Sequence, residues 1–114
     1  MFSLNEDNRY VVCLCGIDLR KGVDGLSGLI RYLSLNPVNG NVYVFLNKSR
    51  TTMKLLHWER GGFVIYYKRL ARGRVSHRVF VKNGVGFRSM RWDELVLLLE
   101  GISPKIKRRK RYNL

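Results

Sequence analysis

The stretch that decides the fold is residues 61–74, GGFVIYYKRLARGR. It opens on two glycines, runs through five apolar or aromatic residues, and then carries four positive charges within residues 68–74. Residues 63–70 have the composition of a β-strand. The charged residues that follow have the composition of a surface that meets an anion. We therefore expect the rest of the chain to support this junction between a strand and a cationic segment.

Two further strand-like stretches lie just before this one, at residues 42–48 and 52–59. In the second stretch, Met53, Leu55 and His57 alternate with Lys54, Leu56 and Trp58, as the two faces of a strand require. The connections between the three stretches are too short for a crossover, so neighbouring strands must be antiparallel. A three-stranded meander is the central structural prediction.

The flanking sequence adds strands and two helices to this meander. Residues 10–17 are apolar on both faces and predict an interior strand. Residues 20–35 have helical spacing of apolar residues behind Asp18, which can cap a helix, although Gly22, Gly25 and Gly28 leave open a start near 23. Residues 75–82 alternate, and Asn83-Gly84 predicts a hairpin turn into 85–88. A last helix is expected from 90 to about 100, capped by Ser89. The expected fold is α+β, with an antiparallel sheet and one helix near each terminus.

Composition narrows the class of protein. The 114 residues fit one domain, which we place at 1–104, with a basic tail at 105–114. There is no run of 18 apolar residues and no signal-peptide pattern at the start, so we expect a cytoplasmic protein that does not cross a membrane. Cys13 and Cys15 are two apart in an apolar run and are interpreted as buried apolar residues. We expect no metal and no cofactor.

The net charge of +14 is unevenly distributed along the chain. Residues 1–47 hold four bases and four acids, whereas residues 48–91 hold twelve bases and a single acid, Glu59. Residues 105–111 add six bases. This asymmetry favours a polyanionic partner, with nucleic acid ahead of an anionic membrane. The pattern leaves DNA and RNA open as the nucleic acid.

The meander places several of these bases at one end of the sheet. The end of its first strand, the start of its second and the end of its third share an edge, so their charges should converge there, with Thr51 between them. The predicted nucleic-acid contacts at this edge are Lys48, Arg50, Lys68, Arg69, Arg72 and Arg74. The tail adds Lys105, Lys107, Arg108, Arg109, Lys110 and Arg111. Arg72 and Arg74 have an alternative role, which is to brace the turn at Gly73.

Signals for catalysis are weak. Asp18, Asp24, Glu59 and Glu100 are scattered and show no spacing typical of a metal cluster. His57 is alone in a strand, where a partly buried structural histidine is the more common case. We therefore expect a protein without enzymatic activity. Trp58 and either Tyr66 or Tyr67 could stack on bases, although aromatic residues in strands more often belong to a core.

Five motifs in order resemble a known family. They are DLRKGxDGL at 18–26, VF at 44–45, KLLxW at 54–58, GFxxYYKRLxRGR at 62–74 and LLLEG at 97–101. Together they resemble the small accessory protein, often called TnpB or Orf2, of bacterial insertion-sequence family sixty-six, over about residues 10–102. The resemblance implies a cytoplasmic helper of transposition whose transposase is a separate polypeptide. The unrelated RNA-guided nucleases that share the name TnpB are not similar to this chain.

Two positions depart from the family pattern. Ala71 stands where the family often has Glu, which makes the segment more basic, and Arg91-Trp92 replaces the Thr-Pro that often opens the last helix. The first hypothesis is therefore a non-catalytic accessory protein that binds DNA backbone with weak sequence specificity. The second is a module that docks on the transposase, with DNA binding secondary. The contact residues of that second hypothesis are Asp18, Arg20, Lys21, Gly22, Asp24 and Gly25.

Overall fold

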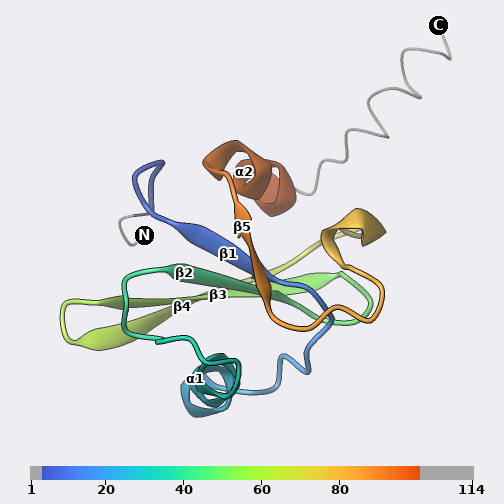
Figure 1. Cartoon of the computed structure of the whole chain (residues 1–114). Helices are drawn as coiled ribbons and strands as arrows, with labels where there is room; N and C mark the ends of the chain where they lie inside the picture. Colours follow the sequence, from blue (N-terminus) through green and yellow to red (C-terminus); the bar gives the residue numbers. More distant parts are fainter. Residues whose placement is uncertain (1–3, 101–114) are drawn as a thin grey trace, which may run out of the picture.

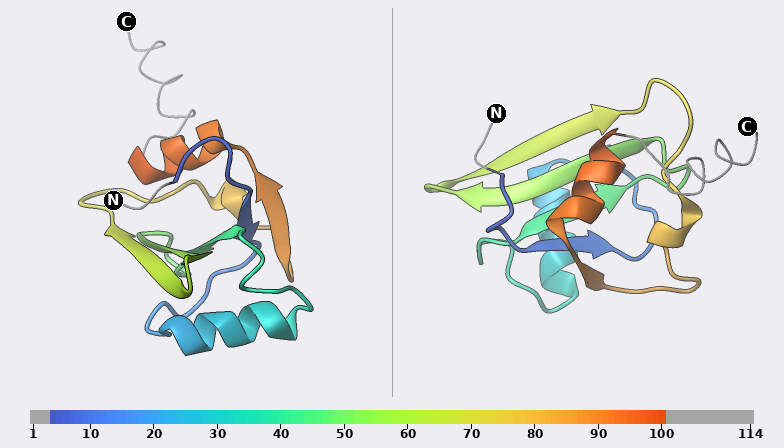
Figure 2. Two further views of the ribbon diagram at one scale, coloured as in Figure 1. Left: turned by 90° about the vertical axis from the view of Figure 1, so that its left-hand side faces the viewer. Right: turned by 90° about the horizontal axis from the view of Figure 1, so that it is seen from above.

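The computed structural model describes residues 4–100 of the chain. In order, the elements are β1 (Tyr10–Cys13), α1 (Val23–Tyr32), β2 (Val42–Leu46), β3 (Thr52–Glu59), β4 (Gly62–Arg69), the 3₁₀ turn η1 (His77–Val79), β5 (Phe87–Met90) and α2 (Trp92–Glu100). The strands form one five-stranded sheet in the order β4-β3-β2-β1-β5. Helix α1 covers one face of this sheet and α2 covers the other (Figures 1 and 2). The α+β class with one helix near each end is confirmed.

The predicted meander is confirmed in β2, β3 and β4. Both of its pairings are antiparallel, and Thr52 at the start of β3 lies opposite Arg69 at the end of β4. The predicted alternation of β3 also holds, because Met53 and Leu55 belong to the core on the α2 side and Leu56 to the core on the α1 side. The short connections thus set the strand directions, as expected.

Strand β1 lies inside the sheet between β2 and β5. It runs parallel to β2, to which α1 connects it, and antiparallel to β5, where Tyr10 lies opposite Met90. All four residues of β1 are buried, which fits its interior position. The sheet is therefore mixed, and the parallel β1–β2 pair is its departure from a purely antiparallel arrangement.

The predicted hairpin of residues 75–82 with 85–88 is wrong. Residues 77–79 form η1, whose start is capped by Ser76 as its hydroxyl accepts a hydrogen bond from the Arg78 N–H at 3.3 Å. Val75 and Val79 are buried but Val81 is 50% exposed, so the alternation does not bury a single strand face. A turn does form, but one residue earlier than predicted: it is centred on Lys82-Asn83, with the Gly84 N–H donating to the Val81 carbonyl at 2.7 Å. The chain beyond it pairs with β1 instead.

Several predicted element ends were also wrong. β1 ends at Cys13 rather than at 17. α1 occupies Val23–Tyr32 with Gly22 as its N-cap, so the alternative start near 23 is confirmed and the predicted end at 35 is wrong. Ser89 does not cap α2, because it lies in β5 opposite Val11. The cap comes from Glu94, whose Oε1 accepts a hydrogen bond from the Arg91 N–H at 3.1 Å.

Two apolar cores, one on each face, hold the helices to the sheet. Leu26 and Ile30 of α1 are fully buried against the β1–β3 strands, and Leu95 of α2 is fully buried on the other face. Burial of one such side chain contributes roughly 1.5–3 kcal/mol. No helix among residues 4–100 is long and apolar enough to cross a membrane. The tail at 105–114 and the boundary at 104 lie outside the described residues and stay predictions.

Candidate nucleic-acid interface

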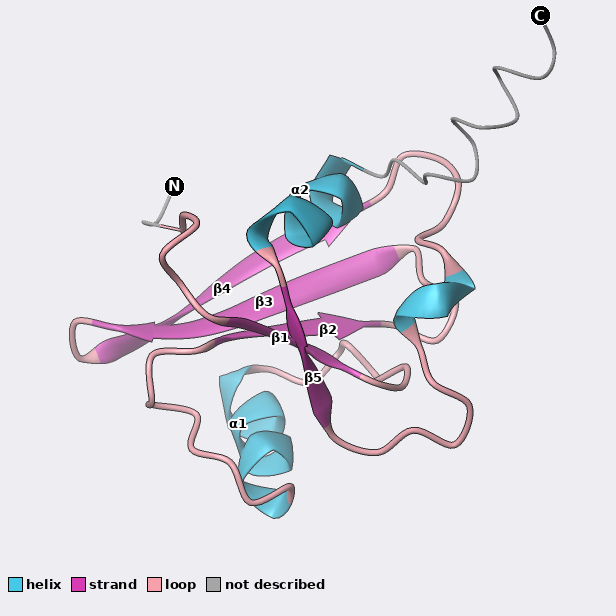
Figure 3. Cartoon of the chain, turned by 45° about the horizontal axis from the view of Figure 1, so that its top comes forward, coloured by secondary structure: helices cyan, strands magenta, loops and turns pink. Residues whose placement is uncertain are grey.

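The end of the sheet where β2 finishes and β3 begins gathers the predicted cationic residues. The β2–β3 turn, the segment after β4 and η1 all lie at this end, opposite the β3–β4 hairpin turn (Figure 3). We call the six bases Lys48, Arg50, Lys68, Arg69, Arg72 and Arg74 the cationic sheet end. Their convergence was predicted from the meander alone, but they do not all make the same contacts.

The β2–β3 turn that carries Lys48 is held by one side chain. The Asn47 Oδ1 accepts hydrogen bonds from the backbone N–H groups of Thr51 at 2.9 Å and Thr52 at 3.1 Å, and its Nδ2 donates to the Thr51 Oγ1 at 3.1 Å. An asparagine that satisfies the backbone of its own turn fixes the turn's shape. Lys48 is therefore an exposed ammonium on an ordered support.

Arg50 braces the cationic sheet end. Its Nη1 donates a hydrogen bond to the Val75 carbonyl at 3.0 Å, and its own carbonyl accepts one from the Val75 N–H at 2.9 Å. The Arg50 backbone has a φ of 61°, in the left-handed region that non-glycine residues adopt at a cost. The guanidinium thus ties the β2–β3 turn to the segment after β4.

Lys68 also makes a structural contact. It lies opposite Met53 on the face covered by α2, and its ammonium donates a hydrogen bond to the Leu99 carbonyl in the last turn of that helix. A cation at a helix C-terminus is favourable because the last carbonyls carry partial negative charge. Lys68 therefore docks α2 on β4 and is only partly exposed.

The remaining four bases, Lys48, Arg69, Arg72 and Arg74, are exposed. Within residues 4–100, none of them forms an ion pair. Arg72 and Arg74 flank Gly73, whose φ of 73° makes the turn, and neither guanidinium donates a hydrogen bond inside the described part of the chain. The bracing role predicted as an alternative for Arg72 and Arg74 is filled by Arg50.

A groove of about 590 Å³ opens beside this end of the sheet, on the face covered by α1. It is lined by Ile17, Asp18, Leu19, Arg20, Asn47, Lys48, Ser49, Thr52 and Tyr67. The segment after β1 reaches the β2–β3 turn because Gly16 has no side chain: a Cβ there would lie 2.6 Å from the Lys48 Cα. The groove thus joins the family motif at 18–26 to the cationic sheet end.

Asp18 and Arg20 form a bidentate pair at the edge of the groove. The Arg20 Nε lies 3.0 Å from the Asp18 Oδ1 and its Nη2 lies 2.7 Å from the Oδ2. These hydrogen bonds, together with one from the Arg20 N–H, hold the pKa of the Asp18 carboxyl well below its usual range. The Arg20 side chain is 91% exposed, so its remaining N–H groups face solvent. Asp18 is thus neutralised locally.

The three aromatic residues considered for base stacking are placed differently. Trp58 packs edge-on against Phe63, with ring centroids 4.9 Å apart, and Tyr66 packs against the core on the α2 side. Tyr67 projects to the other face, lines the groove and is 56% exposed. Of the three, Tyr67 is the one placed beside exposed cations.

Three bases near this end were not among the predicted contacts. Lys54 donates from its Nζ to the Lys21 carbonyl at 3.1 Å and lies 5.8 Å from the centre of the Tyr67 ring. Arg78 in η1 and Lys82 after it are exposed and follow the segment that Arg50 holds. The signal that could have found them is their position inside the block 48–91, which has one acid.

The other titratable candidates have structural surroundings. His57 is buried, with its Nδ1 3.4 Å from the Asn41 carbonyl and its Nε2 3.7 Å from the Glu59 Oε2. Burial raises the pKa of the Cys13 thiol to about 11, which keeps it protonated and unreactive near neutral pH. Across residues 4–100, no three His, Cys, Asp or Glu side chains are placed to share a metal ion.

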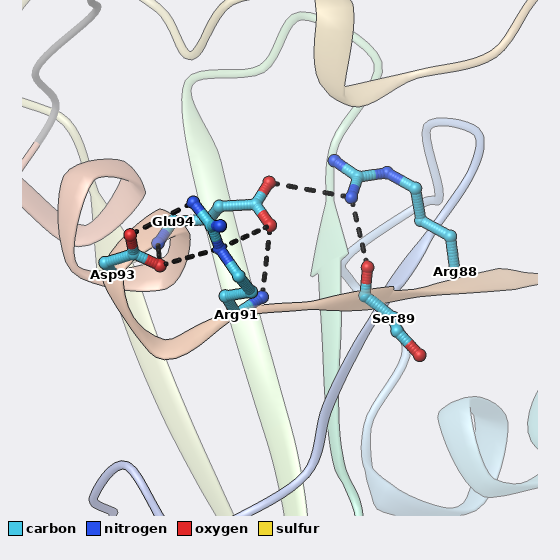
Figure 4. Close-up of polar contacts among 5 residues, drawn as sticks. All are labelled: Arg88, Ser89, Arg91, Asp93 and Glu94. Atoms are coloured by element: carbon cyan, nitrogen blue, oxygen red, sulfur yellow. Dashed lines mark hydrogen bonds and ion pairs between the residues drawn. The ribbon is translucent and has the colours of Figure 1, made fainter.

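A second group of bases lies at the junction of β5 and α2 and is paired with acids. The Arg91 Nε is 3.1 Å from the Asp93 Oδ1 and 4.0 Å from the Glu94 Oε1, and the Arg88 Nη1 is 3.6 Å from the Glu94 Oε2 (Figure 4). The first turn of α2 thus neutralises the two arginines before it. We call these four residues the β5–α2 junction.

Comparison with known proteins identifies the family of this chain. Over 111 residues, or 96% of this chain and 92% of the relative, the chain is 27% identical to "Uncharacterized protein y4jC" of Sinorhizobium fredii (strain NBRC 101917 / NGR234). It is 36% identical over 75 residues to "Uncharacterized protein y4hO" of the same organism, a match that covers 65% of each chain. No solved structure matches the chain. The family described as "IS66 Orf2 like protein" matches residues 8–109, and the chain therefore belongs to the IS66 Orf2-like family of insertion-sequence transposition accessory proteins.

Proposed function

We propose that this accessory protein is non-catalytic and binds DNA through its phosphate backbone at the cationic sheet end. The observation that carries the proposal is the set of four exposed bases, Lys48, Arg69, Arg72 and Arg74, which have no acidic partner within residues 4–100. Exposed cations that are not neutralised within the fold are available to phosphates. When they bind, they displace the counterions condensed on DNA, and this release favours binding. The site of action would be the cytoplasm, where the element's DNA lies.

The support beneath these bases suits contact with an extended polyanion. Asn47 orders the turn below Lys48, and Arg50 ties that turn to the segment that carries Arg72 and Arg74. Cations on an ordered support lose little conformational freedom when they bind, so more of the electrostatic attraction appears as affinity. The basic tail at 105–111 would add contacts from the chain beyond Glu100.

Binding of this kind would read sequence weakly. Base recognition usually requires a helix or strand pair that enters the major groove with polar side chains. α1 carries one base, Arg31, and α2 carries three acids and no base. The contacts would therefore go mainly to phosphates, which position a protein on DNA without specifying a sequence.

A salt titration tests the proposal. The full chain is mixed with labelled duplexes of the element end and of random sequence, and the dissociation constant is measured between 50 and 200 mM salt. If six to ten phosphates are contacted, affinity for both duplexes should fall about 10³–10⁵-fold over this range. The Arg69→Ala/Arg72→Ala variant should flatten the slope by up to about two units on both duplexes alike. A variant that changes sequence preference instead would contradict contact led by the backbone.

Removal of residues 105–114 measures how much of the affinity for DNA comes from the tail and how much from the domain. The four exposed bases of the cationic sheet end are still present in this truncated chain, so DNA binding should persist with a shallower salt slope. Loss of all binding at 50 mM salt would assign the affinity to the tail and contradict a role for the sheet.

Docking on the separate transposase is the second candidate function. It is favoured by the exposure of the family motif, because Arg20, Lys21, Gly22, Asp24 and Gly25 all face solvent. Co-purification with the transposase, combined with no DNA binding at 50 mM salt, would favour docking over the DNA proposal. Metal-dependent nicking of DNA that Asp18→Ala or Asp24→Ala abolishes would contradict the non-catalytic part of the proposal.

A further inference from the structure

The Tyr67 ring is an exposed aromatic surface in a charged setting. It is 56% exposed, whereas Phe63 and Ile65, four and two residues earlier on the same face of β4, pack against the core beneath α1. Exposing apolar ring area to water has a free-energy cost of about 25 cal/mol per Å². Packing within residues 4–100 therefore leaves much of this ring uncovered and accessible to a ligand.

The walls of the groove combine two kinds of chemistry. Ile17 and Leu19 supply apolar parts of the lining, and Thr52 supplies a hydroxyl. Lys48 is exposed at the rim, and Arg20 offers the N–H groups that Asp18 does not use. An aromatic platform with apolar sides and cations at its rim suits a ligand that has both a flat base and a phosphate.

The ring is also held in place. The Lys54 ammonium lies 5.8 Å from the ring centre and is itself fixed by its hydrogen bond to the Lys21 carbonyl at 3.1 Å. A cation near an aromatic face is attracted to it, which restrains the side chain before any ligand arrives. Among residues 4–100, Asp18 is the only acid that lines the groove, and because it is paired with Arg20 it opposes an anion less than a free carboxylate would.

We propose that this groove takes an unpaired nucleotide of DNA, with its base stacked on Tyr67 and its phosphate beside Lys48. The groove volume of about 590 Å³ lies within the roughly 300–1,000 Å³ that is usual for small-molecule sites. A paired base inside a duplex has both faces covered by its neighbours and cannot offer one to a tyrosine. The site would therefore favour single-stranded ends or overhangs. The inference rests on the proposed function, because it assumes that the cationic sheet end beside the groove binds DNA.

The test compares the full chain on three labelled probes in one buffer: a blunt duplex, the same duplex with an oligothymidine overhang, and oligothymidine alone. Stacking of one base should make the overhang probe bind about tenfold more tightly than the blunt duplex. Tyr67→Ala should abolish this preference while changing blunt-duplex affinity less than about twofold. Tyr67→Phe keeps the ring and should retain the preference.

Tyr32→Ala is the matched control. Tyr32 is 83% exposed, near the C-terminal end of α1 and away from the groove, so its removal should leave all three affinities unchanged. Thermal unfolding of each variant checks that the fold is intact. A preference that survives Tyr67→Ala, or that Tyr32→Ala also removes, would overturn the inference.

The remaining outcomes separate this inference from the function on which it rests. If wild type binds blunt and overhang duplexes equally, the groove inference fails and the backbone proposal stands. If wild type binds none of the probes, both fail. If it binds only the unpaired probes, and does so through Tyr67, the groove inference stands and duplex binding fails. An oligouridine that binds more tightly than oligothymidine would overturn the assignment to DNA.

Discussion

The bases of the cationic sheet end and those of the β5–α2 junction come from the same basic block, residues 48–91, yet they have different surroundings in the fold. At the junction, Arg88 and Arg91 are within 4.0 Å of carboxylates from the first turn of α2. At the sheet end, Lys48, Arg69, Arg72 and Arg74 have no such partner among residues 4–100. Charge counted along a sequence therefore does not give the charge that is available to a ligand.

The difference follows from local geometry. The chain turns directly from β5 into α2, so acids that follow the block in sequence fold back onto its last two bases. The sheet-end bases of residues 68–74 are followed by a loop and η1, which contain no acid. An acid a few residues away in sequence neutralises a base only where a tight turn brings the two side chains together.

The comparison can be tested with two matched double variants. Arg72→Gln/Arg74→Gln and Arg88→Gln/Arg91→Gln each remove two positive charges, one pair from each region. Each lost phosphate contact should cost about tenfold in affinity at 50 mM salt, so the sheet-end variant should bind DNA about 100-fold more weakly. The junction variant should stay within about threefold, because its bases are already paired and the solution screens distant charge.

Stability should show the opposite pattern in the same two variants. Loss of the junction's ion pairs should lower the free energy of unfolding by about 0.5–1 kcal/mol, as is typical of exposed pairs in a small network. The sheet-end variant should change it by less than about 0.5 kcal/mol. Urea unfolding measures both. Equal DNA defects in the two variants would mean that total charge, rather than the region, determines binding.

Arg50 refines the comparison. It lies in the cationic sheet end, but like the junction arginines its guanidinium already has a partner within the fold. Arg50→Ala should lower the free energy of unfolding by about 1–2 kcal/mol, since it removes the hydrogen bond to the Val75 carbonyl. Arg50→Gly should lower the free energy of unfolding by up to about 1 kcal/mol less than Arg50→Ala does, because a φ of 61° suits glycine. Lys48→Ala, at the exposed neighbour, is the control for urea unfolding. If Arg50→Ala proves no less stable than Lys48→Ala, Arg50 is not a brace.

How well the sequence predicts each part of the fold depends on how far apart in the sequence the paired residues lie. The meander was predictable because its turns are short and leave a single possible strand direction. The pairing of β5 with β1 joins Tyr10 to Met90, and no local pattern indicates such a contact. Apolar and polar residues alternate over 75–82 as they would in a strand. In the structure, residues 77–79 form a 3₁₀ turn instead, and the Val81 N–H donates a hydrogen bond to the Leu14 carbonyl.

The candidate site was predictable in position but not in the roles of its members. Convergence of the bases follows from strand order alone. That Lys68 docks α2 could not be predicted, because it depends on which face of the sheet that helix covers. That Gly16 lets the family motif meet Lys48 depends on a contact across 32 positions of sequence. Packing of this kind forms the groove, and it leaves no periodic pattern in the sequence from which the groove could be predicted.

The acid that caps α2 gives a third and smaller test, on the junction side of the comparison. Glu94→Ala should lower the free energy of unfolding by about 0.5–1 kcal/mol, because the Arg91 N–H loses its acceptor. Glu94→Gln keeps an acceptor oxygen at the same position and should retain most of the stability. Equal losses in the two variants, measured by urea unfolding, would mean that the carboxylate acts through its ion pairs with Arg88 and Arg91 and not as a cap.

The smallest expected effect concerns Asp18, the acid that pairs with Arg20 beside the cationic sheet end. Its pKa is lowered in the folded state by hydrogen bonds from Arg20, so the folded protein keeps it ionised below the value near 3.9 that is usual for an unfolded chain. As the pH falls past that value, the unfolded state takes up a proton that the folded state does not, and the stabilisation by the pair declines. Wild type should therefore exceed Asp18→Asn in urea midpoint at pH 7, and the difference should shrink below about pH 4. Asp24→Asn, which removes a carboxylate but leaves the pair intact, is the matched control. If the Asp18→Asn difference is independent of pH, the pair with Arg20 does not stabilise the fold.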